Sequence, residues 1–275
     1  YELNKIEKEK LFFDSLMEEL KFHFENNKQY RNFCINKNFD PFTFEGELKD
    51  IPPIAVSVFK DLGANLKSVP ENEVKLSLQS SATSGFPSTV VLDKITAKRQ
   101  AKVMIKVVKD FIGAERKPFI VVDVSPDPKN IKFLGARYAA IGGYLNFADK
   151  VNYALVKDDN ETVSFDIEKT KSFVEALDKN TPIVVFGFTY ILYAQVVKPL
   201  LDRKINFELP KGSKIIHIGG WKKLENEKIS KDKFNKSMAK LFFVKEEHVI
   251  DIYGFTEQMG LNYPDCECGY KHTPL

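Results

Sequence analysis

The chain has 275 residues, of which 43% are hydrophobic and 29% charged, and its formal net charge is +3. This length and apolar content predict one large globular domain or two smaller ones, with a sizeable core. The weak charge bias does not favour a nucleic-acid or membrane-surface partner, and no apolar run of about 18 residues is present to span a membrane. The three cysteines form no disulfide framework, so we expect a reducing, cytoplasmic environment.

The N-terminal part of the chain leads to a polar loop between two strand-like segments. Residues 2–37 carry apolar side chains near helical spacing among Lys and Glu, which predicts a helix. Proline-rich connectors follow, and residues 55–61 have the length and apolar content of a helical turn. Residues 74–92 (VKLSLQSSATSGFPSTVVL) then place small, hydroxylated residues between two alternating strand patterns.

The loop in the middle of this stretch has the chemistry of a phosphate-binding loop. Its hydroxyls and backbone N–H groups can all donate hydrogen bonds to phosphate oxygens, and none of its side chains before Phe86 is bulky. It is not a Walker A loop, because Gly-Lys-Ser/Thr is missing and a strand follows it. An ordinary polar hairpin turn explains the same residues equally well. The residues concerned are Ser80, Ser81, Thr83, Ser84 and Gly85.

The rest of the chain alternates strands with helices, which predicts an α/β fold with a largely parallel sheet. Thr96 is the predicted N-cap of a helix over residues 96–113. A second helix is predicted over residues 133–147, and we expect Gly142 and Gly143 to interrupt it. Strands are predicted at residues 118–124, 151–156, 182–188, 214–218 and 249–253, and helices at residues 96–113, 133–147, 166–177, 189–201 and 230–243.

Two of the predicted strands end in residues that suit a ligand site, since ligands of open α/β sheets bind beyond the carboxyl ends of the strands. Gly219 and Gly220 let the backbone approach a ring or phosphate closely, although a tight turn explains them as well. The segment Tyr253-Gly254-Phe255-Thr256-Glu257 offers a stacking ring, a hydroxyl and a carboxylate. A carboxylate beside phosphates suits a Mg²⁺ ligand, whereas the first turn of a capped helix is the other interpretation.

The polar loop, the Gly-Gly strand end and Tyr253-Gly254-Phe255-Thr256-Glu257, in this order, resemble the acyl-adenylate-forming enzymes. The loop of that superfamily usually reads Ser/Thr-Ser/Thr-Gly-Thr-Thr-Gly-x-Pro-Lys. This chain departs from it at Ala82, Ser84 and Ser88, and the last change removes a positive charge. Residues 23–33, 51–60 and 217–224 are similar to one branch, the bacterial acyl-protein synthetases, which are fatty-acid luciferin-component ligases.

The resemblance implies the fold of a large N-terminal adenylate-forming domain over residues 1–275, with mostly parallel sheets layered with helices. A C-terminal lid domain follows in that superfamily, so we expect this chain to stop before the lid lysine and an acyl-accepting cysteine. The implied reaction is ATP-dependent activation of a carboxylic, fatty acid to acyl-AMP, followed by transfer to a thiol, with a reductase or carrier protein as partner. The alternatives are a non-catalytic nucleotide-binding relative and a ligase that passes the acyl group to coenzyme A or a carrier protein.

The same resemblance implies roles for the candidate residues. Thr256 contacts phosphate, and Glu257 holds a Mg²⁺ ion that neutralises charge on the leaving pyrophosphate. Because a carboxylate is already a nucleophile, transition-state stabilisation rather than a protein base carries the first step. The phosphates are held by Ser80, Ser81, Thr83, Ser84 and Gly85, and the adenine and acyl pockets are framed by Gly219, Gly220, Tyr253 and Gly254.

A second group of residues near the end of the chain has metal-binding chemistry. Cys266, Cys268 and His272 supply two thiols and an imidazole within seven residues, which suits zinc with a fourth ligand from elsewhere. The spacing is not Cys-x2-Cys and three ligands do not complete a structural site, so a role without metal is the favoured interpretation. Use of Cys266 or Cys268 as an acyl-accepting nucleophile is favoured less.

Overall fold

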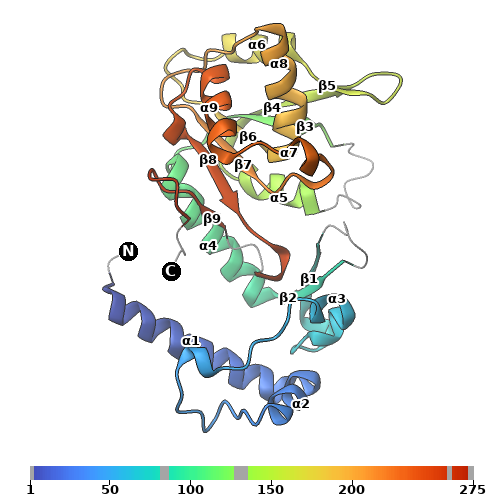
Figure 1. Cartoon of the computed structure of the whole chain (residues 1–275), viewed down its shortest axis with the longest axis vertical. Helices are drawn as coiled ribbons and strands as arrows, with labels where there is room; N and C mark the ends of the chain where they lie inside the picture. Colours follow the sequence, from blue (N-terminus) through green and yellow to red (C-terminus); the bar gives the residue numbers. More distant parts are fainter. Residues whose placement is uncertain (1–2, 81–86, 127–135, 259–261, 272–275) are drawn as a thin grey trace. The chain divides into compact units, whose positions relative to one another are not determined.

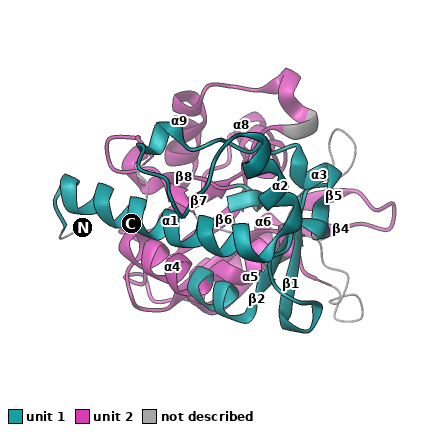
Figure 2. Cartoon of the chain, turned by 90° about the horizontal axis from the view of Figure 1, so that it is seen from below, with its two compact units in different colours: residues 1–100, 255–260, 275 teal, residues 101–254, 261–274 magenta. Residues whose placement is uncertain are grey.

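The computed structural model describes residues 3–80, 87–126, 136–258 and 262–271. The chain divides into two compact units (Figure 2), the first consisting of residues 1–100, 255–260 and 275 and the second of residues 101–254 and 261–274. Each unit has a buried apolar cluster of its own. Within the described ranges, no helix combines the length and the apolar character needed to cross a bilayer.

The second unit is built on a mixed, mostly parallel sheet (Figure 1), as the alternation of strands and helices predicted. In the described part of the chain the strand order is β5-β4-β3-β6-β7-β8-β9. The five central strands run parallel, and β5 and β9 are antiparallel at the two edges. The strands are β3 (Lys117–Val124), β4 (Ala148–Lys157), β5 (Val163–Phe165), β6 (Val184–Phe188), β7 (Lys214–Ile218), β8 (Val249–Tyr253) and β9 (Tyr263–Pro264).

Helices cover both faces of this sheet, which is why its central strands are apolar along most of their length. Tyr144 of α5 packs its ring 4.4 Å from that of Phe186. His217 follows a residue paired with Phe186, so its side chain points to the opposite face, where it meets Phe234 of α9 at 4.7 Å. The helices are α4 (Lys94–Ile112), α5 (Ala136–Leu145), α6 (Ile167–Glu175), α7 (Thr189–Ile191), α8 (Lys198–Arg203) and α9 (Lys231–Phe242), and a π-helical turn, η5 (Leu192–Val197), joins α7 to α8.

Two details of the predicted helices are wrong. Helix α5 continues through Gly142 and Gly143, where an interruption was expected. A Cβ atom on Gly143 would lie 2.7 Å from Cε of Met104 in α4, so this glycine permits close packing of two helices. Helix α4 begins before Thr96, and the carboxylate of Asp93 accepts a hydrogen bond from the Thr96 N–H at 2.7 Å. Asp93 therefore performs the capping role that was predicted for Thr96.

The first unit contains helices and a two-stranded hairpin. The single helix predicted over residues 2–37 is two helices, α1 (Lys5–Asn26) and α2 (Lys28–Asn36), which are separated at Asn27. Asn27 has extended backbone, and its side chain caps α2 by accepting a hydrogen bond from the Tyr30 N–H. A short helix, α3 (Val58–Asp61), occupies part of the predicted turn. The hairpin pairs β1 (Val74–Gln79) with β2 (Thr89–Asp93) in antiparallel fashion.

Short 3-10 turns complete the described structure. In the first unit they are η1 (Leu48–Asp50), η2 (Gly63–Leu66), η3 (Glu71–Glu73) and η8 (Thr256–Gln258). In the second unit they are η6 (Lys222–Glu227) and η7 (Glu246–His248). The turn η8 follows β8 in the chain and therefore carries the last residues of the Tyr-Gly-Phe-Thr-Glu segment.

Candidate active site

The carboxyl edge of the sheet brings two of the predicted segments together. Strands β7 and β8 are parallel neighbours, with Ile218 opposite Ile252, so both strands end at the same edge. Gly219 and Gly220 follow β7, and Tyr253 and Gly254 end and follow β8. The second unit therefore places these four candidate residues next to one another, at the edge where ligands of open α/β sheets bind.

The two glycines at the end of β7 serve different purposes. Gly219 has a φ of +85°, in the left-handed region that side chains rarely adopt, so the turn requires glycine here. A Cβ atom on Gly220 would meet nothing within 4 Å, so this residue leaves open space at the edge of the sheet. The turn interpretation thus applies to Gly219, and close approach of a ligand remains a prediction for Gly220.

Tyr253 presents its ring at the same edge. Its side chain is half exposed, and its ring lies 6.3 Å from the ring of Tyr263 on the neighbouring strand β9. The buried Trp221, which follows Gly220 in the chain, packs its ring 4.9 Å from that of Tyr193 and 6.3 Å from that of Phe234. An exposed aromatic ring such as that of Tyr253 is suited to stacking with a flat heterocycle.

The first unit contains the other predicted segments. The strands expected on either side of the polar loop are the hairpin strands β1 and β2, and Ser80 lies at the start of the loop. The Ser80 N–H donates to the carbonyl of Ser88 at 3.0 Å, and the Ser88 N–H donates to the Ser80 hydroxyl oxygen at 2.8 Å. The remaining predicted phosphate ligands, Ser81, Thr83, Ser84 and Gly85, lie outside the described residues.

The turn η8 lies against β2, the strand that follows the polar loop. Within the first unit, the Thr256-Glu257 pair is thus carried by an element that packs beside the loop's own strand. The side chain of Glu257 is partly buried and forms no ion pair with any other described residue, so its carboxylate oxygens are available to a ligand. The described residues Thr256–Gln258 form a 3-10 turn, and residues 259–261, where the alternative of a capped helix would continue, lie outside the described residues.

Ser88 stands at the position where the resemblance led us to expect a lysine. It is completely buried, and its hydroxyl oxygen has no hydrogen-bond partner in the described structure. A buried serine hydroxyl supplies no positive charge at this position.

The cysteine pair lies in a tight turn. Asp265 and Lys271 form an isolated β-bridge, and between them the Cys266 N–H bonds to the carbonyl of Tyr270. Cys266 is partly buried and Cys268 is exposed. The third predicted zinc ligand, His272, lies outside the described residues. Among the described residues, no group of three or more His, Cys, Asp or Glu side chains is arranged to hold a metal ion.

A buried ion pair at the end of β3 was not predicted from the sequence. Asp123 is 1% exposed, and its Oδ1 atom lies 2.8 Å from Nη2 of Arg137 on α5. Burial raises the pKa of Asp123, although the Arg137 charge and hydrogen bonds from Val124 and Arg137 lower it. The signal that could have revealed the site is a carboxylate inside the apolar run 118–124.

A second polar cluster, also unpredicted, lies beneath α9. His217 of β7 is buried, with its Nδ1 atom 2.9 Å from the Thr189 hydroxyl and 3.7 Å from Oδ1 of Asp251. Lys271 lies within 3.3 Å of carboxylate oxygens of both Asp251 and Asp265. These contacts fasten the segment that follows β8 to the sheet.

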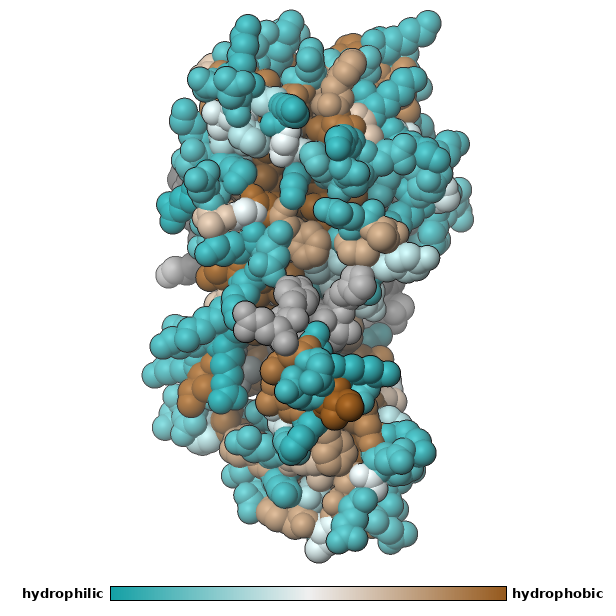
Figure 3. Space-filling view, turned by 90° about the vertical axis from the view of Figure 1, so that its left-hand side faces the viewer, coloured by the Kyte–Doolittle hydropathy of each residue, from teal (hydrophilic) through white to brown (hydrophobic). Residues whose placement is uncertain are grey.

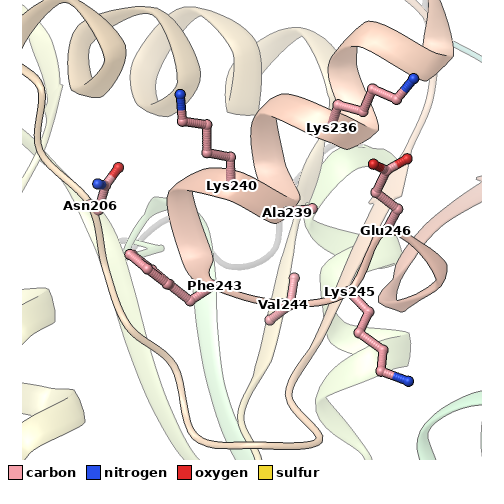
Figure 4. A pocket seen from close by; sticks show the side chains of 8 residues that line it. All are labelled: Asn206, Lys236, Ala239, Lys240, Phe243, Val244, Lys245 and Glu246. Atoms are coloured by element: carbon pink, nitrogen blue, oxygen red, sulfur yellow. The ribbon is translucent and has the colours of Figure 1, made fainter.

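Two surface depressions lie away from those candidate residues that the structure describes. One of about 540 Å³ lies at the C-terminal end of α9, which is at the amino edge of the sheet. Figure 4 shows the exposed Phe243 and three lysines around it. A smaller one, of about 390 Å³, lies in the first unit beside α1, and Figure 3 shows hydrophobic patches among hydrophilic residues on one face of the molecule. The larger is lined by Asn206, Lys236, Ala239, Lys240, Phe243, Val244, Lys245 and Glu246.

The family model described as acyl-protein synthetase, LuxE, matches residues 1–274 of the chain. The chain belongs to this acyl-protein synthetase family. Two curated relatives are named long-chain-fatty-acid–luciferin-component ligase. The protein of Aliivibrio fischeri is 24% identical over 98% of this chain and 68% of its own length, and that of Vibrio harveyi is 23% identical over 90% of this chain and 62% of its own length. The chain thus spans about two thirds of these relatives.

The same architecture occurs in solved structures of 2-hydroxyisobutyryl-CoA ligase. The open conformation in complex with 2-HIB-AMP and CoA superposes with a TM-score of 0.67 at 13% identity, over 96% of this chain and 54% of that chain. The thioesterification state gives a TM-score of 0.63 at 14% identity, over 97% and 53% of the two chains. The acyl-protein synthetase domain therefore has the fold found in about half of an acyl-CoA ligase chain.

Proposed function

We propose that this acyl-protein synthetase chain activates a carboxylic acid with ATP and prepares the acyl group for transfer to a thiol. The observation that carries the proposal is the placement of the Tyr253–Glu257 segment, which leaves the carboxyl end of β8 and continues into a turn against β2. Within the first unit, the end of this segment carries the Glu257 carboxylate on a turn beside the strand of a hydroxyl-rich loop, in a member of an acyl-transferring family.

In the first step, a carboxylate oxygen of the acid attacks the α-phosphorus of ATP, so that acyl-AMP forms and pyrophosphate leaves. The hydroxyls and N–H groups of the polar loop, with Thr256, hold the phosphates and stabilise the charge that develops on them. Tyr253 stacks with adenine, and the backbone at Gly219, Gly220 and Gly254 leaves room for the nucleotide and the acyl group. These residues bind and orient the reactants, which lowers the barrier by proximity.

A Mg²⁺ ion fits the chemistry of Glu257, because Mg²⁺ prefers oxygen ligands and is commonly held by one or two carboxylates together with substrate phosphates. The carboxylate of Glu257 is partly exposed and free of ion pairs in the described structure, so it is available for this role. When bound, the ion supplies positive charge beside the leaving pyrophosphate.

In the second step, a thiolate attacks the carbonyl carbon of acyl-AMP, a thioester forms and AMP leaves. The names of the relatives point to a long-chain fatty acid as the substrate and to a luciferin component as its partner in the ligation. Coenzyme A and a carrier protein are the alternative thiol acceptors. Intact mass measurement after incubation with acid and ATP distinguishes acylation of the protein itself from transfer to a separate thiol acceptor. Only self-acylation leaves an adduct on the protein.

One observation favours a second candidate function, a nucleotide-binding relative without catalysis. Ser88 is buried where the resemblance led us to expect a lysine, so the loop lacks a positive charge for the phosphates. Calorimetry with ATP and Mg²⁺ tests this candidate, which predicts binding by the full-length protein without formation of AMP.

Acid-dependent exchange between ATP and labelled pyrophosphate tests the proposed function. We expect the full-length protein to catalyse exchange with at least one acid from a panel of saturated fatty acids and aromatic acids, and we expect Glu257→Ala to abolish it. Glu247→Ala, which removes an exposed carboxylate of η7, is the matched control. Absence of exchange with every acid, in folded protein, would contradict the proposal.

A further inference from the structure

Asp123 is a charged side chain inside a sheet that is otherwise apolar. Its Oδ1 atom accepts hydrogen bonds from the Val124 N–H and from Nη2 of Arg137, both at 2.8 Å. Its Oδ2 atom is equally buried but has no hydrogen-bond partner among the described residues. Half of this carboxylate is therefore desolvated without compensation, which is a costly arrangement.

Stability gives no reason to retain such a pair. Replacing a buried ion pair by apolar residues is often neutral or stabilising, because desolvation of the two charges offsets their attraction. Strand β3 also carries an irregularity in its pairing with β4 between Val121 and Val124, where Asp123 lies. Bulges of this kind re-aim side chains and are frequent beside active sites. The placement of Asp123 is thus better explained by its ion pair with Arg137.

Asp123 holds Arg137, which lies in the first turn of α5. The guanidinium also packs against an aromatic ring, with its Cζ atom 5.5 Å from the ring centroid of Tyr138, and the Tyr190 side chain of α7 contributes to the raised pKa of Arg137. The Arg137 side chain is still 37% exposed. A guanidinium has five N–H donors, so a fixed and partly exposed Arg137 has donors left for a ligand.

The position of Arg137 in the fold is the one at which ligands of α/β sheets bind. From β3 the chain continues to β4 on one side and later returns to β6 on the other side of β3. The carboxyl ends of β3 and β6 therefore form the topological switch point of the sheet, where the loops diverge and leave a crevice. Arg137 follows β3, and Tyr190 follows β6.

We propose that Arg137, positioned by Asp123, is the anion-binding residue of the switch point and takes a carboxylate or phosphate oxygen of the reactants. The inference rests on the proposed function, which supplies two anionic reactants, a carboxylic acid and ATP. A planar guanidinium matches either oxyanion with two parallel hydrogen bonds. The acid and the nucleotide share this chemistry, and binding measurements distinguish them.

Calorimetry on the full-length protein provides the test, with dodecanoate compared with dodecan-1-ol and ATP compared with adenosine. Each pair shares its neutral part and differs in the anion. We expect the wild type to prefer at least one anion over its neutral partner by about tenfold or more, the range of a hydrogen bond to a charged group. Arg137→Gln should reduce that preference by about tenfold while leaving the affinity for the neutral partner unchanged.

Two further variants separate anion binding from a structural role. Arg203→Gln removes an exposed arginine from α8 at the other edge of the sheet, and it should keep the preference. Asp123→Asn should weaken the preference when Arg137 is present and should have no further effect in Arg137→Gln, since Asp123 acts through Arg137. Circular dichroism and thermal unfolding show whether each variant is folded.

The proposal is wrong if the wild type prefers neither anion, or if Arg137→Gln weakens the anion and its neutral partner equally. Loss of preference for dodecanoate alone assigns Arg137 to the acid, and loss for ATP alone assigns it to the phosphates. These outcomes are independent of pyrophosphate exchange. Exchange without an Arg137-dependent preference would overturn this inference alone, and the preference without exchange would overturn the proposed function alone.

Discussion

Replacing His217 should change how the stability of the protein depends on pH. The imidazole is fully buried beneath α9, and burial lowers its pKa to about 4. The charges of Asp251 and Asp265 oppose this effect, whereas Lys271 reinforces it. The ring is therefore neutral in the folded protein at pH 7, and its Nε2 atom has no hydrogen-bond partner among the described residues.

The sign of the effect follows from proton binding. Below pH 6.5, the ordinary pKa of histidine, the unfolded chain takes up a proton that the folded protein binds only near pH 4. The stability present above pH 6.5 is thus lost as the pH falls toward 4. For these two pKa values the loss between pH 7.5 and pH 5 is about 2 kcal/mol. Most carboxylates titrate below this window, so they contribute little to it.

Urea unfolding of the wild type at pH 7.5 and pH 5 measures this loss. We expect His217→Gln, which cannot be protonated, to lose about 2 kcal/mol less than the wild type over this interval. His248→Gln, at a partly exposed position of η7, is the matched control and should retain the wild-type dependence. An unchanged pH dependence in His217→Gln would refute the assignment of a neutral buried imidazole.

Three further predictions concern stability, measured as the free energy of unfolding in urea. Tyr144→Phe should stabilise the protein by about 1 kcal/mol, because the Tyr144 hydroxyl is buried and unpartnered in the described structure. Phe243→Gly should also stabilise it, by up to about 1 kcal/mol, because Phe243 ends α9 in the left-handed conformation with a φ of +53° and is largely exposed. Asp93→Ala should destabilise it by about 1 kcal/mol through loss of the α4 cap.

Each of these predictions has a control within the chain. Phe186→Leu changes the buried ring that packs beside Tyr144, and it should destabilise the protein. A gain of stability in Tyr144→Phe, which keeps the ring, would therefore come from removal of the hydroxyl. Lys204→Gly, at the left-handed end of α8 with a φ of +56°, should reproduce the gain of Phe243→Gly. Asp93→Asn preserves the acceptor and should lose less than Asp93→Ala. A loss of stability in Tyr144→Phe would contradict the cost assigned to the unpartnered hydroxyl, and a loss in Phe243→Gly would contradict the cost assigned to the left-handed backbone. Unchanged stability in Asp93→Ala would contradict the capping role of Asp93.

The sequence predicted the parts of the fold that have a local signal. Strands β7 and β8 appear at the predicted residues because buried parallel strands are short apolar runs between polar turns. Strands β5 and β9 were missed because three and two residues are too short to show alternation. The break at Asn27 was missed because apolar spacing continues across it, and only the capping contact with Tyr30 reveals it.

The candidate site was predictable where its residues are neighbours in the chain. The segments around Gly219 and Tyr253 were found by position after a strand, and the parallel pairing of β7 and β8 brings them together. The Asp123–Arg137 pair joins a strand to a helix across a loop, so neither residue has a sequence neighbour that signals the contact. The network around His217 likewise combines two strands, two helices and the segment after β8.

The central claim is that a carboxylate oxygen attacks the α-phosphorus of ATP, and an isotope measurement tests it most directly. A saturated fatty acid labelled with ¹⁸O in both carboxylate oxygens is incubated with ATP, Mg²⁺ and a thiol acceptor in the presence of the full-length protein. Attack at the α-phosphorus places one labelled oxygen on the phosphate when the thiol releases AMP, so mass spectrometry should find AMP that carries a single ¹⁸O. Unlabelled AMP, or ADP formed together with labelled phosphate, would contradict the claim.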